Sequence, residues 1–148
     1  MTPDVPIVLN GIVRSLMMDL GPELQSPYAM LTAQLASPLL MMIAQEFDRA
    51  AARLAEENEA LGQLFHDARD VVTEPELRAA LADAAAGSQA SLLVSALRER
   101  NRSLRALLVR LHAHVDTLKS AAAQALDARI WVELAASTQR RHLDLAIG

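Results

Sequence analysis

The chain has 148 residues, a formal net charge of −4 and no cysteine. The absence of cysteine excludes disulfides, cysteine-based zinc fingers and thiol nucleophiles, and the negative charge gives no general attraction to nucleic acid or anionic lipid. Hydrophobic residues make up 52% of the chain but aromatic residues only 3%, and the apolar residues are mostly alanine and leucine. This composition favours helices, so we predict an all-α fold in a single helical-bundle domain over residues 1–148.

The first predicted helix runs from Val5 to Leu20, where apolar residues recur at helical spacing. The Gly21-Pro22 pair that follows is typical of a helix end. No basic segment precedes the apolar residues of this region, so we expect no signal peptide and a cytoplasmic location.

The next helix signal is Ser26-Pro27, a capping residue followed by proline, and Ser37-Pro38 repeats it. Either a short helix ends at the second signal or a long helix kinks there, and the helical pattern then continues to about Asp70. The most apolar window, residues 28–47, contains six residues that interrupt a membrane-spanning pattern, namely Thr32, Gln34, Ser37, Pro38, Gln45 and Glu46. We therefore expect this window to form core and not a membrane span.

Three further helices are predicted in the second half of the chain. Thr73 and Glu76 form a capping-box signature, so a short helix is expected over 74–87. Ser88 is the expected cap of a helix that ends near Leu118, and a last helix is expected over 120–146. The predicted architecture is an antiparallel helical bundle of three long helices plus two shorter ones.

The predicted helix 88–118 contains a regular heptad pattern with an amide on its apolar line. The positions alternate steps of four and three residues: Ala90, Val94, Leu97, Asn101, Leu104, Leu108, Leu111, Val115 and Leu118. The flanking heptad positions are mainly basic, which argues against a parallel homodimer through this line, because like charges would face each other. The pattern instead favours an acidic partner helix.

The segment LAEENEAL (54–61) has the same skeleton as LRERNRSL (97–104), with glutamates where the second has arginines. We predict that the two helices pack antiparallel, with the 74–86 helix in the connection, and that Asn58 and Asn101 form a buried hydrogen-bonded pair surrounded by opposite charges. A shifted register would leave the amides unpaired at a cost of about 1–3 kcal/mol. The alternative is that both asparagines face solvent.

The motif HAHVD (112–116) resembles the His-x-His of metal-dependent hydrolases. On a helix, however, residues two apart point about 200° from each other, so His112 and His114 cannot share a metal. His112 with Asp116 and His66 with Asp70 do share helix faces, and two such pairs on adjacent helices could form a four-ligand site. The favoured interpretation is ordinary surface hydrogen bonding, and we expect no metal or cofactor.

Five of the six methionines lie within residues 17–42, as Met17, Met18, Met30, Met41 and Met42. Methionine is adaptable, so such a cluster either fills a core or lines a surface that binds a partner. Adjacent residues of a helix point partly apart, so we expect the second residue of each pair, Met18 and Met42, to be the one exposed.

Arg98, Arg102 and Arg105 project within about 60° of one another around their helix. This stripe could bind a phosphate or a carboxylate of a ligand. The alternatives are ion pairs with the glutamates of the helix 38–70 and plain solvation.

A family resemblance rests on three stretches of the sequence: SALRERNRSLRALLVRLHAHVD, ARIWVELAASTQRRHLDL and AQEFDRAAARLAEEN. The chain resembles uncharacterised small bacterial all-helical proteins encoded near aminoglycoside-phosphotransferase-like kinases and acyl-CoA dehydrogenases. The resemblance covers under half of the chain and implies an accessory role in acyl or small-molecule metabolism. It carries over no functional residue.

From the residues we expect a non-catalytic accessory protein that binds another protein, or a second copy of itself as a homodimer, through the apolar methionine-rich helical surface. The alternative is a carrier of an acyl or other apolar anionic ligand in a bundle cavity, with the arginine stripe at its head group. Catalysis is disfavoured, because no acid, base or metal set converges in the sequence. Nucleic acid is not an expected partner, since Trp131 and Tyr28 have no aromatic companions for base stacking.

Overall fold

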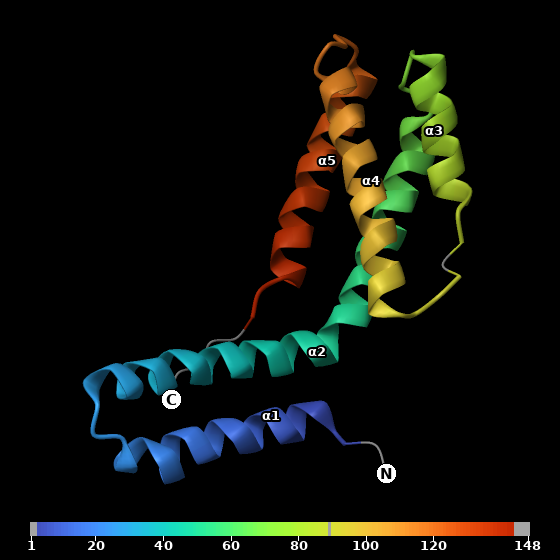
Figure 1. Cartoon of the computed structure of the whole chain (residues 1–148). Helices are drawn as coiled ribbons and strands as arrows, with labels where there is room; N and C mark the ends of the chain where they lie inside the picture. The colour runs from blue at the N-terminus through green and yellow to red at the C-terminus, as the bar shows by residue number, and fades with distance from the viewer. Residues whose placement is uncertain (1–2, 89, 144–148) are drawn as a thin grey trace. The chain divides into compact units, whose positions relative to one another are not determined.

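The computed structural model describes residues 3–88 and 90–143, and every regular element in them is helical. The elements are α1 (Val5–Arg14), the π-helical turn η1 (Ser15–Leu20), the 3₁₀ turn η2 (Gly21–Glu23), α2 (Pro27–Ala68), α3 (Pro75–Ala86), α4 (Val94–Val115) and α5 (Ala121–Arg140) (Figure 1). The predicted all-α fold of three long and two shorter helices is confirmed.

The chain divides into two compact units. Within the described residues, the first holds 3–50 with 142–143, here called the hairpin unit, and the second holds 51–141, called the bundle unit. The helix α2 contributes residues to both. A single domain over 1–148 stays a prediction.

The hairpin unit is built from α1, the two short turns and the first half of α2, which lie side by side (Figure 1). Asp4 caps α1, since its Oδ1 accepts a hydrogen bond from the Ile7 amide at 3.2 Å. The predicted first helix has the expected extent, but its second part, Ser15–Leu20, is π-helical. For Ser37-Pro38 the sequence left two outcomes open, a helix end or a kink within a long helix. The helix does not end there, because α2 is continuous through Pro38.

The bundle unit holds the second half of α2 together with α3, α4 and α5, and the chain reverses direction from each helix to the next (Figure 1). α2 and α4 therefore run parallel. Side-chain contacts agree, because Asn58 bonds to Leu97 near the start of α4, whereas Thr73, just beyond α2, bonds to His114 at its end. The predicted antiparallel packing of these two helices is wrong. The reason is that α3 runs back along α2, so the chain reverses twice before α4 begins.

One apolar core joins the four helices of the bundle unit. Its buried members are Leu61, Leu64, Phe65, Ala68, Val72, Leu77, Leu81, Leu104, Leu108, Leu111, Val115, Ala123, Leu126 and Ile130. The heptad line of α4 supplies four of them, and its Leu97 and Asn101 are buried as well. The predicted apolar line of α4 is thus confirmed along its central turns.

The predicted helix caps have mixed outcomes. The last helix begins next to its predicted start, and Ser120 caps it, since the Ser120 Oγ accepts a hydrogen bond from the Ala123 amide at 3.1 Å. The capping box of Thr73 is wrong, because Glu74 is the cap residue of α3 and makes no side-chain cap bond, while Thr73 contacts His114. Ser88 caps nothing either, because α4 begins only at Val94.

The last helix also differs from its predicted length. The described part of α5 ends at Arg140, earlier than the expected residue 146. Residues 144–146 of that prediction lie outside the described residues.

The fold predicts unequal costs for two leucine truncations in the same unit. Leu111 is fully buried, so Leu111→Ala should lower the free energy of unfolding by about 2–5 kcal/mol through lost burial and the cavity left behind. Leu92 is exposed just before α4, so Leu92→Ala should change the free energy of unfolding by less than about 0.5 kcal/mol. Urea denaturation of both variants checks the assignment, and equal costs would contradict it.

Candidate functional site

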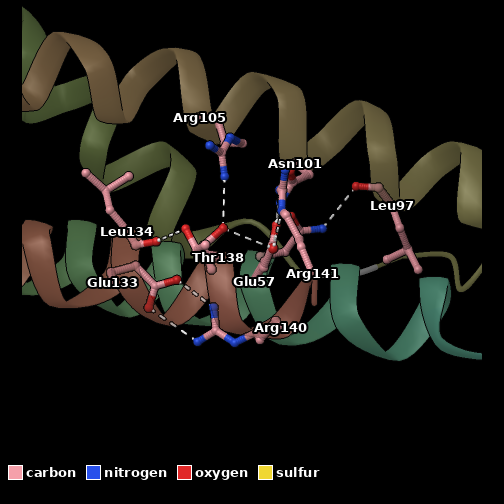
Figure 2. Close-up of polar contacts among 11 residues, drawn as sticks. Glu57, Leu97, Asn101, Arg105, Glu133, Leu134, Thr138, Arg140 and Arg141 are labelled. Carbon is pink, nitrogen blue, oxygen red and sulfur yellow. Dashed lines mark hydrogen bonds and ion pairs between the residues drawn. The ribbon is translucent and has the colours of Figure 1, made fainter. Parts of the chain in front are cut away.

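Glu57 lies on the inner side of α2 with its side chain only 1% exposed, and it is the centre of a polar network in the bundle unit (Figure 2). Arg141, directly after α5, donates from Nε to Oε1 at 2.9 Å and from Nη2 to Oε2 at 2.7 Å. Ser137 of α5 donates to Oε1 at 3.1 Å, and Asn101 of α4 donates to Oε2 at 3.1 Å. One carboxylate thus joins three helices of the bundle.

Asn101 also donates to Oδ1 of Asn58 at 3.0 Å, and Asn58 donates from Nδ2 to the Leu97 carbonyl at 3.1 Å. Both asparagines are buried. The hydrogen bond predicted between the two amides is therefore present, although the helices that carry them run parallel. A role of this pair in setting the register of α2 against α4 stays a prediction.

The charge state of Glu57 follows from two opposing effects. Burial raises the pKa of the carboxyl, but the hydrogen bonds and charge of Arg141, with the hydrogen bonds of Ser137 and Asn101, outweigh it and lower the pKa below its ordinary value of 4.5. Glu57 is therefore ionised at neutral pH.

This geometry makes Glu57 a poor candidate for proton transfer. Its oxygens already accept four hydrogen bonds, which is close to the capacity of a carboxylate. A general base needs an open lone pair within reach of a substrate. The network instead connects α2, α4 and α5.

The arginine stripe does not act as one unit in the structure. Arg98 is exposed, and Arg102 pairs with Glu99 of its own helix. Arg105 donates to Ser137 Oγ at 3.1 Å and so extends the Glu57 network.

The predicted set of opposite charges around the asparagines is also wrong. The cation that pairs with Glu57 is Arg141, while Arg100 bonds to the carbonyls of Gly87 and Ser88. The expectation considered only the arginines of α4, whereas the cation that reaches Glu57 comes from the end of α5.

Sequence reasoning missed Glu57, Ser137 and Arg141 as members of one network. A signal for the glutamate was present, because Leu54, Glu57, Asn58 and Leu61 recur at the spacing of a buried helix stripe. No comparable signal pointed to Arg141, whose partner is 84 residues away along the chain.

The surface of the bundle unit carries a second acidic centre. Asp67 accepts hydrogen bonds from Arg129 at 2.6 Å, Gln63 at 2.9 Å and His66 at 3.0 Å. These bonds, that of Arg129 first, lower the pKa of Asp67 to about 2. The centre links α2 to α5 on the outside of the bundle.

The two histidines of HAHVD point to different partners, as expected. His114 contacts Thr73, whereas His112 Nε2 lies 2.9 Å from Asp127 Oδ1 and 3.9 Å from Asp116 Oδ1. The alternative four-ligand site, which would join this pair to His66 and Asp70, is not formed among the described residues. Among the described residues, the potential metal ligands that come together are His112, Asp116 and Asp127.

The hairpin unit exposes most of its large apolar side chains. Its buried residues are small: Ser37, Ala44 and Ala50. The exposed ones are Ile7, Val8, Ile12, Met17, Met18, Leu20, Tyr28, Met30, Leu31, Leu35, Leu39, Met41, Ile43 and Phe47. The expectation that residues 28–47 form core is therefore wrong for the isolated chain.

The methionine pairs follow the expected pattern only once. Met18 is 70% exposed and Met17 is 45% exposed, so the second member is the more accessible. In the other pair the order is reversed, because Met41 is exposed while Met42 is half-buried.

Within the described residues, α2 is also long and apolar enough to span a bilayer by length and composition. Only a small share of its most apolar window is buried in the chain. The same surface therefore satisfies the simple criteria for contact with lipid and for contact with protein.

No family model, curated protein or solved structure matches this chain. The resemblance to small bacterial helical proteins therefore stays a prediction.

The Asn58–Asn101 pair predicts energetic coupling. In a double-mutant cycle of Asn58→Leu and Asn101→Leu, Asn101→Leu leaves Asn58 Oδ1 without its donor and removes a hydrogen bond from Glu57, whereas Asn58→Leu removes one of the two acceptors of Asn101 Nδ2. Each single variant should cost about 1–3 kcal/mol. The double variant should cost less than the sum of the singles by about 1 kcal/mol or more, measured by chemical denaturation. A control cycle of Asn58→Leu with Val132→Ala, an exposed position of α5, should be additive. Additivity in the first cycle would show that the amides do not interact.

The Glu57 network predicts a pH-dependent cost for removing Arg141. Because the folded-state pKa of Glu57 is lowered, its stabilisation is present above about pH 4.5 and is lost as the pH falls through the folded-state value. Arg141→Met should therefore lower the free energy of unfolding by about 1.5–3 kcal/mol at pH 7 and by less below pH 4.5, where Glu57 can take up a proton.

The matched control for this variant is Arg102→Met. Arg102 pairs with Glu99 on the surface, where an ion pair contributes roughly 0–1 kcal/mol. A cost for Arg141→Met that stays constant from pH 7 to pH 4 would contradict the proposed origin of the stabilisation.

Proposed function

We propose that this protein is a non-catalytic assembly module that associates with a second copy of itself through the apolar, methionine-rich surface of the hairpin unit. The observation that supports this most is the concentration of exposed large apolar side chains between Ile7 and Phe47. Soluble monomers rarely expose contiguous apolar surface of this kind, and such surface marks an interaction site.

The two helices of the hairpin unit carry apolar side chains on the faces that contact each other and also on other faces, which are exposed. Leu31, Leu35 and Leu39 follow one another at i, i+4 and i+8 along α2, and all three are exposed. A row of this spacing is the stripe that a helix buries against a neighbouring helix. Among residues 3–88 and 90–143, no helix covers this stripe, so a further helix is needed to bury it.

A second copy of the chain supplies suitable helices. A two-fold interface uses the same patch on both partners, and an apolar patch satisfies this requirement without charge complementarity. Two hairpins packed face to face form a four-helix arrangement, the common way to bury apolar stripes of this length. The methionines at its centre adapt to an irregular contact because their side chains are flexible.

A bilayer is the competing occupant of the surface. Two charged residues of the hairpin unit argue against a bilayer: Arg14 at the end of α1 and Asp19 in η1. Asp19 accepts a hydrogen bond from Ser15 at 2.9 Å. Charged side chains are costly at membrane depth. A protein interface tolerates them at its polar rim, which favours the second copy.

The carrier alternative needs an enclosed apolar cavity. A cleft of about 360 Å³ in the bundle unit has Asn58, Glu59, His66 and Arg100 among its lining residues. These polar walls suit an acyl chain poorly, so we favour assembly over transport of an apolar ligand.

The test is to place a charge within the apolar stripe. Leu35 is 59% exposed, so Leu35→Glu should leave the fold intact but shift the full-length protein from dimer to monomer in sedimentation equilibrium. The matched control is Val109→Glu, at an exposed valine of α4 in the bundle unit, which should leave the mass unchanged.

Two results would overturn the proposal. One is a wild-type protein that is monomeric on the order of tens of micromolar, well above the dissociation constant of a stable dimer. The other is flotation of the wild-type protein with phosphatidylcholine vesicles that is lost in Leu35→Glu and retained in Val109→Glu, which would assign the surface to lipid.

A further inference from the structure

The end of α4 and the start of α5 bring together a histidine and two carboxylates. His112 and Asp116 are four residues apart, so their side chains lie on the same side of the α4 terminus, and Asp127 belongs to α5. The ligand atoms of the three residues all lie within 4.8 Å of one another. Neither the Glu57 network nor the apolar surface uses these residues.

The distances in this cluster are close to those that a metal ion requires. His112 Nε2 is 2.9 Å from Asp127 Oδ1 and 3.9 Å from Asp116 Oδ1. Around a tetrahedral zinc ion, with bonds of about 2.0–2.2 Å, neighbouring ligand atoms are about 3.4 Å apart. The two measured distances bracket this value, so small side-chain rotations are sufficient to admit an ion.

The imidazole is held in place by its surroundings. The side chain of His112 is 24% exposed, and its ring packs against Trp131 in a T-shaped contact with centroids 5.3 Å apart. A ring oriented by packing loses little freedom when it binds an ion, which favours binding. Asp116 is the exposed ligand and leaves a side of the cluster open to water.

The local charge also favours a cation. Within the described part of the chain, neither Asp116 nor Asp127 forms an ion pair with lysine or arginine, so His112 is the basic group that faces both. Asp116 is the residue that caps the C-terminus of α4, where the helix dipole already places partial negative charge. A positive ion between the two carboxylates would offset their charges and the partial negative charge at the end of α4.

We propose that His112, Asp116 and Asp127 form a binding site for a divalent transition-metal ion of the Zn²⁺ type, with water in the remaining coordination positions. One imidazole with two carboxylates suits zinc, copper or nickel better than magnesium or calcium, which prefer oxygen ligands alone. The ion binds the lone pair of Nε2 in the tautomer whose proton is on Nδ1, and it takes the place of the contact between Nε2 and Asp127. Its structural effect is to join α4 to α5 across the turn at 116–120.

The position of Trp131 provides a direct readout. It is the only tryptophan of the chain, and its ring lies against the proposed ligand His112. Because Cu²⁺ quenches indole fluorescence only at short range, Cu²⁺ added to the full-length protein should quench the emission of Trp131 in a saturable way. Zn²⁺ should compete with the quenching, bind in a calorimetric titration and raise the melting temperature.

Two near-isosteric variants test the ligands without removing the contact between His112 and Trp131. Asp127→Asn and Asp116→Asn should each weaken Zn²⁺ binding and Cu²⁺ quenching by about tenfold or more. The matched control is His66→Ala, which removes a histidine beside Asp67 elsewhere on the bundle surface and should leave both measurements unchanged. Far-UV circular dichroism of each variant verifies that the helices are intact.

The proposal is overturned if Cu²⁺ quenching does not saturate, or if Asp127→Asn binds Zn²⁺ as tightly as the wild type. It is also overturned if His66→Ala weakens binding as much as the aspartate variants, which would indicate unspecific association with surface side chains. None of these measurements depends on the oligomeric state, so their outcome is separate from the test of self-association.

Discussion

The packing of the bundle unit depends on one buried ion, the Glu57 carboxylate. Its four hydrogen bonds come from α4, from α5 and from Arg141 after α5, so the position of each of these elements is coupled to α2. A buried charge is tolerated only when it is paired and fully hydrogen-bonded. An arrangement of the helices that loses Arg141 or Asn101 leaves the carboxylate incompletely satisfied. This penalty makes the network selective among possible packings.

The amide pair adds a second constraint at the same level of the bundle. Asn58 follows Glu57 directly, and Asn101 bonds to both residues, so the charge and the amides form one continuous network between α2 and α4. Farther along the two helices, Leu61 of α2 and Leu104 of α4 belong to the apolar core. Apolar side chains by themselves discriminate weakly between neighbouring registers of two helices. We predict that the directional hydrogen bonds of the amide pair supply this discrimination, because a displaced amide would lose its partner in the core.

The two compact units use their apolar residues in opposite ways. In the bundle unit, four helices surround a common core and the large apolar side chains are mostly buried. In the hairpin unit, α1 with its two short turns and the first half of α2 bury too little surface against each other, so side chains such as Met18 and Leu35 stay exposed. The contrast follows from the number of helices available to cover each stripe. It also separates the proposed roles, with assembly in the hairpin unit and ion binding at the α4–α5 end of the bundle unit.

The sequence alone determined the helical class and much of what each helix buries. The heptad line of α4 and the partnership of Asn58 with Asn101 follow from local periodicity and from the matching of two segments, and both are seen in the structure. Tertiary structure decided the direction of α2 against α4, the choice of Arg141 as the partner of Glu57, and the approach of Asp127 to His112. Periodicity records which face of a helix is buried but not which helix covers it or in which direction that helix runs. Those choices arise only when the whole chain packs, because they depend on residues tens of positions apart meeting in space.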